Sequence, residues 1–375
     1  MRSTWMACLL RARFECLPSC ATNLRITLTL YALCGIGWLP ASCAQADPAP
    51  VEPPSVSVDH HVHALSPELL RDWSGLEGPF SKPDDVYTEL ATLDRQRAAA
   101  LGAVLVPMGH LYAMVEFQRA LGLGDSAAQQ AVERENQYVK ELAARSSNRV
   151  ALCSVPIRAG WAERALKRCL EDPGYAGIKL HLGAARADFR DAETVELLSA
   201  VFSSANAAGL PILLHLDNQV RGTDIEHIEF FLRRVLGPLP DAQVLIAHLG
   251  GSGGYAVWTQ RVYHAINRWL AKEAKAGRPR AGIHFDISAV ALTKSVSGLP
   301  AISEEEARQL AKDMRTFGLS RLVFASDWPS FAPDDYLKAF SRFGQLQAED
   351  IAVLMGQRFE FVRRHRHTAP DRPGK

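Results

Sequence analysis

The strongest constraint on the fold is a regular alternation of short apolar runs with amphipathic segments of helical period. Apolar runs of strand length occur at residues 56–61, 103–107, 150–156, 177–182, 211–217, 243–249, 282–288 and 321–327. Helical patterns follow them in turn, at 84–100, 127–146, 161–170, 193–208, 224–236, 258–276, 303–317 and 348–364. This order predicts an α/β protein with a single (β/α)8 TIM barrel. A doubly wound open sheet is the alternative, but the chain has no Gly-rich phosphate loop after an early strand.

The residues before the first strand have the features of a targeting sequence. Arg2, Arg11, Arg13 and Arg25 precede the apolar run 26–39, and the small-residue site 44–46 follows it. This pattern predicts a secretory signal peptide over residues 1–46, then a Pro-rich linker over 47–55, the barrel over 56–365 and a tail over 366–375. The apolar run is shorter than the about 20 residues of a membrane span, so we expect an exported, periplasmic or secreted protein. Lipid attachment at Cys43 is a second interpretation.

Charge and cysteine content exclude some classes of protein. The chain has 42 Lys and Arg residues against 41 Asp and Glu residues, with no basic block, so nucleic acid is not an expected partner. If residues 1–46 are removed, only Cys153 and Cys169 remain. Two cysteines are too few for a disulfide scaffold. We expect both to be buried apolar side chains and not partners in a bridge.

Polar side chains gather at the carboxyl ends of the predicted strands, where the active site of a TIM barrel lies. These residues are His61 and His63 on the first strand, Lys179 and His181 on the fourth, His215 on the fifth, His248 on the sixth and Asp327 on the eighth. Strand residues two apart project to the same side, so His61 and His63 reach one point, as do Lys179 and His181.

This set of side chains has the chemistry of a metal site. Imidazole and carboxylate groups bind Zn²⁺ and similar divalent cations, and a catalytic site leaves one position open for water. The metal lowers the pKa of its bound water to about 7, and a nearby His or carboxylate carries the proton. The sequence therefore predicts a metal-dependent hydrolytic site, with zinc as the expected metal, at one or two ions per chain.

The segments 61–63, 247–251 and 325–327, together with His215, resemble the amidohydrolase superfamily of metal-dependent TIM-barrel enzymes. The chain is most similar to the amidohydrolase-related branch (amidohydrolase 2), which includes aminocarboxymuconate-semialdehyde decarboxylase-like proteins. Further similarities lie at 141–145, 177–181 and 285–288. The resemblance covers nearly all of the predicted barrel.

The resemblance also implies roles for single residues. His61, His63 and His215 would be metal ligands, and Asp327 a ligand or the general base. His248 would bind a second metal, or polarise the substrate and move protons. Two interpretations of Lys179 stay open: a carboxylated lysine that bridges two metals, or an ammonium that pairs with a carboxylate such as Asp327.

Substrate contacts are expected from the segments that follow the strands. Arg186, Arg190 and Arg221 are candidates to hold a substrate carboxylate, because guanidinium pairs with carboxylate in a bidentate way. His181 either contacts substrate or fills the barrel mouth. Trp328 forms either an apolar wall of the site or part of the core.

Three functions fit these features. The first is hydrolysis of an amide, lactone, ester or phosphoester of a small molecule by metal-activated water. The second is metal-dependent, non-oxidative decarboxylation of a small aromatic or muconate-type acid, as the resemblance implies. The third is an exported binding protein on the same barrel without turnover. A homodimer is the prior expectation for a soluble enzyme.

Overall fold

The computed structural model describes residues 58–76, 102–218, 220–295, 299–333, 336, 339 and 346–362. The chain divides into two compact units, Met1–Val51 and Glu52–Lys375, and all of the described residues belong to the second. The predicted signal peptide, linker, helix at 84–100 and tail lie outside the described residues, so those domain boundaries stay predictions.

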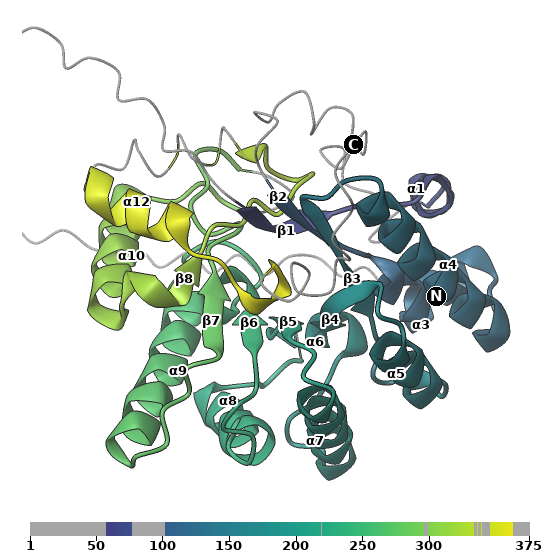
Figure 1. The fold of residues 1–375 in the computed structure, drawn as a ribbon, viewed down its shortest axis with the longest axis horizontal. Helices are drawn as coiled ribbons and strands as arrows, with labels where there is room; N and C mark the ends of the chain where they lie inside the picture. Colours follow the sequence, from purple (N-terminus) through teal and green to yellow (C-terminus); the bar gives the residue numbers. More distant parts are fainter. Residues whose placement is uncertain are drawn as a thin grey trace, which may run out of the picture. The chain divides into compact units, whose positions relative to one another are not determined.

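Eight parallel strands form one sheet in sequence order, each paired with the next along the chain (Figure 1). They are β1 (Val58–His63), β2 (Gly102–Val106), β3 (Arg149–Ser154), β4 (Tyr175–His181), β5 (Ile212–His215), β6 (Val244–Ile246), β7 (Ile283–Asp286) and β8 (Leu322–Val323). Each one overlaps a predicted strand, and the polar residues predicted at strand ends lie at or just beyond these ends.

Backbone hydrogen bonds join the last strand region to the first. The amide of His60 donates to the carbonyl of Phe324 at 3.1 Å, and the amide of His63 donates to the carbonyl of Trp328 at 2.8 Å. An isolated parallel bridge pairs Val62 with Trp328. The ends of the sheet thus meet, which confirms the predicted (β/α)8 barrel.

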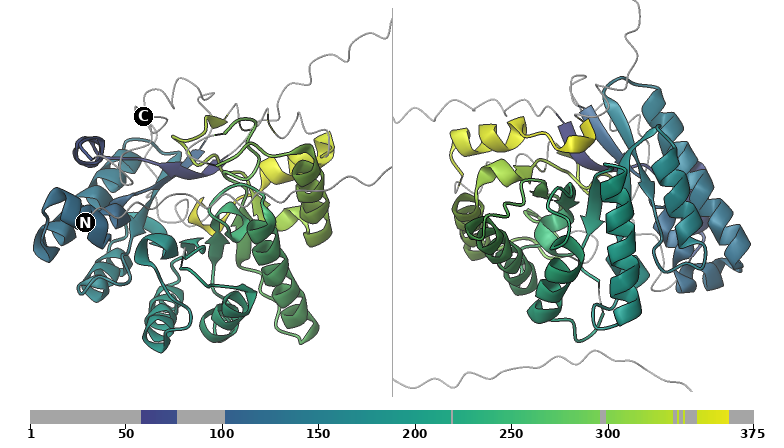
Figure 2. Two further views of the ribbon diagram at one scale, coloured as in Figure 1. Left: turned by 180° about the vertical axis from the view of Figure 1, so that it is seen from behind. Right: turned by 60° about the horizontal axis from the view of Figure 1, so that its bottom comes forward.

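The helices lie on the outside of the strands (Figures 1 and 2). They are α1 (Pro67–Ser74), α3 (Val115–Leu121), α4 (Asp125–Ala144), α5 (Ala162–Glu171), α6 (Leu182–Ala185), α7 (Ala192–Ala207), α8 (Ile225–Phe231), α9 (Val257–Lys275), α10 (Glu304–Phe317) and α12 (Ala348–Gly356). Short turns of other helix types are η2 (Gly109–Ala113), η3 (Leu232–Leu236), η4 (Ala247–Gly250) and η5 (Leu319–Arg321). Within the described residues, every predicted helix is present.

Two helix predictions need correction at their ends. The pattern at 224–236 is α8 followed by the π-helical turn η3, not one regular helix. The pattern at 348–364 yields α12, which ends at Gly356 because Gln357 adopts an extended backbone (φ −69°, ψ 143°). Capping explains other ends: Ser303 and Glu306 form a reciprocal capping box at the start of α10.

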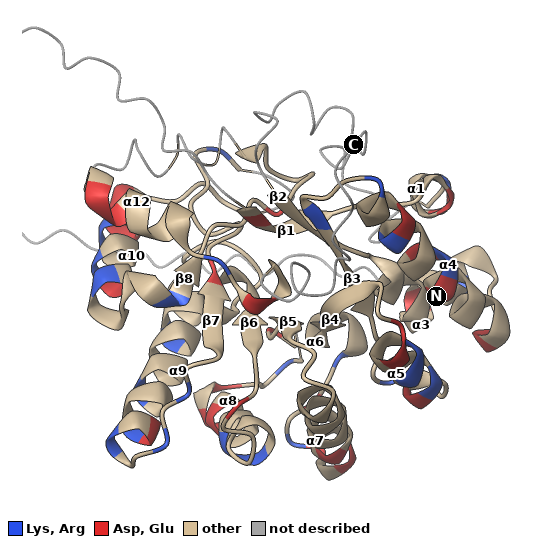
Figure 3. Cartoon of the chain, viewed as in Figure 1, with Lys and Arg blue, Asp and Glu red and all other residues tan. Residues whose placement is uncertain are grey.

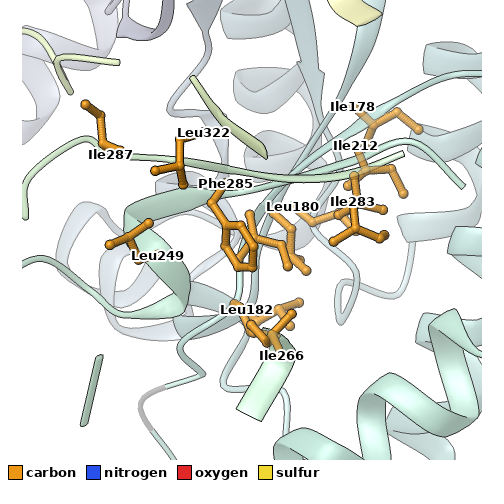
Figure 4. Close-up of a cluster of buried hydrophobic side chains, with 14 of the residues drawn as sticks. Ile178, Leu180, Leu182, Ile212, Leu249, Ile266, Ile283, Phe285, Ile287 and Leu322 are labelled. Atoms are coloured by element: carbon orange, nitrogen blue, oxygen red, sulfur yellow. The ribbon is translucent and has the colours of Figure 1, made fainter. Parts of the chain in front are cut away.

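The core has two layers, because successive strand residues point to opposite faces. Inside the barrel, Leu213 and Leu245 pack with Val323, Phe359 and other buried residues. Outside it, strand residues pack against the helices, and Figure 4 shows part of this second layer around Phe285 and Leu180. His60 belongs to this framework: its ring bonds the carbonyl of Phe324 at 2.9 Å and accepts the amide of Phe359 at 3.1 Å.

The expectation for the two cysteines is wrong. Cys153 on β3 and Cys169 on α5 form a disulfide, with Cα atoms 5.7 Å apart. Their apolar surroundings indicate burial, which is correct, but the sequence does not show that the fold brings Cys169 on α5 within bonding distance of Cys153 on β3. In the described part of the chain, no helix has the length and apolarity needed to cross a membrane.

Candidate metal centre

The structure brings three predicted site residues together at the carboxyl end of the barrel. Ligand atoms of His61, His248 and Asp327 all lie within 4.8 Å of one another. Nε2 of His61 is 3.7 Å from Oδ1 of Asp327, and Nε2 of His63 is 3.2 Å from the same oxygen. These four side chains are defined here as the metal centre.

Unusual backbone geometry places His248 and Asp327. His248 (φ 53°), Leu249 (φ 54°) and Asp327 (φ 62°) adopt left-handed conformations, and Gly250 follows with φ 93°. A non-glycine residue in this region costs about 1–3 kcal/mol and persists only where the surroundings hold it. Hydrogen bonds stabilise these left-handed conformations: the amide of His248 donates to Asp286, and the amide of Asp327 donates to the carbonyl of His61.

Asp286 organises the centre, although it was not among the predicted site residues. Its carboxylate accepts Nδ1–H of His61 at 2.9 Å, the amide of His248 at 2.9 Å and the hydroxyl of Ser288 at 2.6 Å. Burial opposes its ionisation, but His61 and these hydrogen bonds hold the pKa of the Asp286 carboxyl well below its usual range. The position of Asp286 at the carboxyl end of β7 was the sequence signal that could have identified it.

The tautomers of two site histidines follow from their partners. Because Nδ1 of His61 donates to the Asp286 carboxylate, Nε2 presents its lone pair towards Asp327. Nδ1 of His248 lies 3.1 Å from the carbonyl oxygen of Ser288, which only accepts, so Nε2 of His248 also presents a lone pair. Burial, with a further effect from Lys179, lowers the pKa of His61 to about 3, so its imidazole is neutral at neutral pH.

These residues fit a divalent cation. Oδ1 of Asp327 is buried and accepts no hydrogen bond from the described residues, although Nε2 atoms of His61 and His63 lie nearby. In the tautomer of His61 that Asp286 sets, the lone pair on Nε2 faces this oxygen, and the two repel each other unless a cation lies between them. His61, His63 and Asp327 would hold such an ion, with His248 within reach.

His215 and Lys179 border the metal centre. Nε2 of His215 bonds the hydroxyl of Ser252 at 3.2 Å, and that hydroxyl donates to Asp217 at 2.7 Å, so Nε2 of His215 is directed at Ser252 in this structure. Nζ of Lys179 is 3.4 Å from Nε2 of His61. Burial lowers the pKa of Lys179 to about 8, although Asp286 and Asp327 oppose this.

A cleft of about 510 Å³ opens beside the metal centre, and we name it the side cleft. It is lined by His110, Ala113, Val115, Glu116, Val155, Pro156, Arg158, Ala159, His181, Ala184, Ala185 and Arg186. The ring of His181 stacks on that of His215 at 3.9 Å, which in turn packs 5.1 Å from His248. The rings of His110 and His181 are 4.4 Å apart. His110 was not among the predicted site residues, and its place beside His181 depends on the packing of η2 against α6.

The remaining predicted contact residues lie in different surroundings. Arg186 lines the side cleft and pairs with Glu116 at 2.9 Å. Arg190 pairs with Asp188 at 2.7 Å and donates to the carbonyl of Arg221, and both arginines are exposed. Trp328 is only 2% exposed and packs in the core.

Comparison with known proteins assigns the family. No curated protein matches the chain significantly. The sequence model of the amidohydrolase family, described as "Amidohydrolase", matches residues 58–356. The chain belongs to the amidohydrolase family. The resemblance predicted from the strand-end motifs is therefore confirmed, and the match spans the whole described barrel from β1 to α12.

Solved structures share the barrel of this amidohydrolase. A 2,6-dihydroxybenzoate decarboxylase from Rhizobium is 14% identical, with a TM-score of 0.50 over 83% of this chain and 98% of that one. A 5-carboxyvanillate decarboxylase from Sphingomonas paucimobilis is 13% identical, with a TM-score of 0.50 over 80% and 96%. A dihydroxybenzoic acid decarboxylase from Polaromonas sp. JS666, with bound manganese and 2-nitroresorcinol, is 12% identical, with a TM-score of 0.51 over 83% and 96%.

Proposed function

We propose that this amidohydrolase is a metal-dependent decarboxylase that removes CO₂ from a small aromatic acid without oxidation. The observation that carries the proposal is the buried cluster of His61, His248 and Asp327, oriented by Asp286 at the carboxyl end of the barrel. The similar solved structures support decarboxylation over the hydrolysis first expected, because their names describe decarboxylases of aromatic acids.

The reaction breaks one C–C bond, releases CO₂ and forms one C–H bond with a proton from a neighbouring group. A divalent cation at the metal centre would supply positive charge that binds oxygen atoms of the substrate. His61, His63 and Asp327 would hold it. In the neutral tautomer of His248, Nε2 faces the metal centre and carries no hydrogen, so this nitrogen can take up a proton. We assign His248 to the delivery of that proton to the substrate carbon.

Substrate enters this centre, in our proposal, through the side cleft. Apolar residues of its walls, such as Val155 and Pro156, suit an aromatic ring, and charged and polar residues line the rest of the cleft. Ala184 N–H donates to Nδ1 of His181 at 3.1 Å, so neutral His181 carries its hydrogen on Nε2 and offers a donor to the ligand. Arg186 at the rim would attract an acid to the cleft, as the sequence suggested.

Hydrolysis is the second candidate, and one observation favours it. Oδ1 of Asp327 accepts no hydrogen bond from the described residues, so it is available to take a proton from an attacking water. The same cluster therefore serves either reaction, and the identity of the product distinguishes them.

The test begins with the metal content of the purified protein, followed by assays with 2,6-dihydroxybenzoate, 5-carboxyvanillate and a panel of esters and lactones. We expect CO₂ release from an aromatic acid and, in D₂O, deuterium at the vacated ring carbon. Asp327→Asn should lose metal, whereas His248→Gln should retain it and slow turnover by about 10²–10⁴-fold. Asp313→Asn, which changes a buried partner of His264 outside the metal centre, is the matched control. Hydrolysis of an ester without CO₂ release would support the second candidate, and failure to take up any metal would reject both.

We also propose that the protein is exported, as residues 1–46 predict. The disulfide between Cys153 and Cys169 supports this, because such bonds persist in oxidising compartments and are rare in the cytosol. The test is fractionation of cells that express the full chain, with mass spectrometry of the mature amino terminus. Recovery of a chain that starts at residue 1, with Cys153 and Cys169 both present as free thiols, would contradict the proposal.

A further inference from the structure

A second cleft, of about 550 Å³, lies at the end of the barrel opposite the metal centre, and we name it the basal cleft. It is lined by Glu229, Arg233, Gly237, Pro238, Ala265, Arg268, Trp269, Lys272, Glu273, Arg278 and Arg280. Gly237 precedes β6, and Arg278 and Arg280 precede β7. The strands are parallel and His248 follows the far end of β6, so the two sites lie at opposite ends of the barrel.

The basal cleft is strongly basic in a chain whose overall charge is close to zero. Five of its lining residues are Arg or Lys and two are Glu, an excess of three positive charges. Figure 3 shows the basic positions on the lower part of α9 and on the neighbouring α8 region. Basic residues near a helix C-terminus are favoured by the helix dipole, which accounts for Arg233 and Lys272 singly. It does not account for Arg268 or Arg280 around the same hollow.

The two carboxylates leave much of this charge available. Glu273 accepts from both Arg278 and Arg280, and these hydrogen bonds lower the pKa of Glu273 to about 2. Glu229 is 3.8 Å from Arg233 and 3.9 Å from Arg268, too far for hydrogen bonds. Among the described residues, no carboxylate lies within 4.0 Å of Lys272. The side chains of Arg233, Arg268 and Lys272 therefore keep donors free for a ligand.

The floor of the basal cleft is a fixed cation. The side chain of Arg280 is only 2% exposed, lies 5.5 Å from the ring centre of Trp269, and donates to the carbonyl of Gly237 at 2.6 Å. Its Nη1 has no acceptor among the described residues. A buried guanidinium stays charged, and a buried donor without an acceptor is costly. Arg280, which lines the cleft, thus lacks one hydrogen-bond acceptor among the described residues.

We propose that the basal cleft binds an anion that carries phosphate groups and about three negative charges. Phosphate oxygens accept hydrogen bonds from Arg and Lys in several directions at once, whereas one carboxylate offers two oxygens and a single charge. N–H donors from α9 and η3 surround the basal cleft, and this arrangement suits a phosphate group better than a single carboxylate. The same phosphate chemistry is offered by a soluble oligophosphate and by the headgroups of anionic lipids.

The test is isothermal titration of the full-length protein with inorganic pyrophosphate at low ionic strength. We expect one-to-one binding that weakens with added salt. Arg268→Gln/Lys272→Gln should weaken it by about tenfold or more, because two charge-assisted contacts are lost. The control is Arg164→Gln/Lys167→Gln, which removes the same residue types from the exposed face of α5 and should bind like the parent. Asp327→Asn should also bind like the parent, which excludes capture of pyrophosphate at the metal centre.

A second arm separates the two sources of phosphate. Co-sedimentation with phosphatidylglycerol vesicles but not phosphatidylcholine vesicles, lost in Arg268→Gln/Lys272→Gln, identifies a lipid headgroup as the ligand. Pyrophosphate binding without vesicle binding identifies a soluble one. The proposal is overturned if neither probe binds, or if the α9 double variant binds both as the parent does while its circular dichroism is unchanged.

Discussion

The carboxylate of Asp286 accepts the Nδ1–H group of His61 at 2.9 Å, and this single contact decides which nitrogen of His61 faces the metal centre. Both residues are fully buried. Carboxylates that hold metal-binding histidines in this way fix the tautomer and make the free nitrogen a better ligand. Asp286 also holds the His248 amide, so one side chain orients two groups of the site.

Asp286→Asn should therefore weaken metal binding by about 10–100-fold, because the amide no longer supplies the negative charge that favours the Nε2 lone pair. The measurement is competition with a chelator of known affinity, using zinc and manganese. Asp313→Asn, which alters another His–Asp contact, at 2.8 Å from Nε2 of His264, should leave metal affinity unchanged. Equal metal affinity in parent and Asp286→Asn, with unfolding unchanged, would refute the orienting role.

The turn that carries His248 should depend on Gly250. A Cβ atom there would lie 2.7 Å from Cγ1 of Val262, and the backbone has φ +93°, whereas Gly254 has φ +71° and open space. We expect Gly250→Ala to destabilise the fold by about 2–4 kcal/mol, from strain and overpacking together, and Gly254→Ala by about 1–2 kcal/mol from strain alone. Thermal unfolding of both variants checks this. Equal losses of stability in the two variants would show that the contact with Val262 does not add to the destabilisation.

Glu135 should make stability depend on pH. Burial raises its pKa from 4.5 to about 7, against the hydrogen bonds it accepts from Ser66. The folded state therefore binds more protons than the unfolded state between these two values. Stability should fall as pH rises from about 4.5 to about 7, by about 3 kcal/mol, and level off above.

Urea unfolding of the parent and of Glu135→Gln, at pH 5 and at pH 8, isolates this contribution. Removal of the ionisable group should make the variant more stable than the parent at pH 8, with a much smaller difference at pH 5. Glu141→Gln, an exposed position on the same helix, controls for the loss of one charge. A difference that is the same at both pH values would rule out ionisation of Glu135 as the cause.

The disulfide should contribute measurably to stability. Cys153 and Cys169 are separated by 16 positions, and closure of a loop of this size stabilises a fold by about 3 kcal/mol. Reduction, or the Cys153→Ala/Cys169→Ala variant, should lower the unfolding midpoint accordingly. Alkylation before and after reduction counts the free thiols. Alkylation of both Cys153 and Cys169 in the untreated, unfolded protein would show that the bond does not form.

Much of the architecture could be read from the chain itself. Strand and helix patterns depend on local side-chain periodicity, so all eight strands were predicted within a few residues of their observed places. The polar residues His61, His63, His248 and Asp327 were found for the same reason, since parallel strands bring their carboxyl ends to one mouth. The resemblance to the amidohydrolase family was predicted from these motifs and from their order along the chain.

What the sequence could not decide are relationships between side chains from distant segments. Asp286 stands 225 positions from His61, and only the closed barrel makes it the residue that orients that histidine. The pairing of Cys153 with Cys169 and the contact between the rings of His110 and His181 likewise depend on how the helices and turns pack around the barrel. The orientation of His215 towards Ser252 depends on a glycine-rich turn. The periodicity of apolar residues indicates which face of a helix or strand is buried. Which side chains pair depends on distances between segments that are far apart in the sequence, and these distances are set only when the barrel closes.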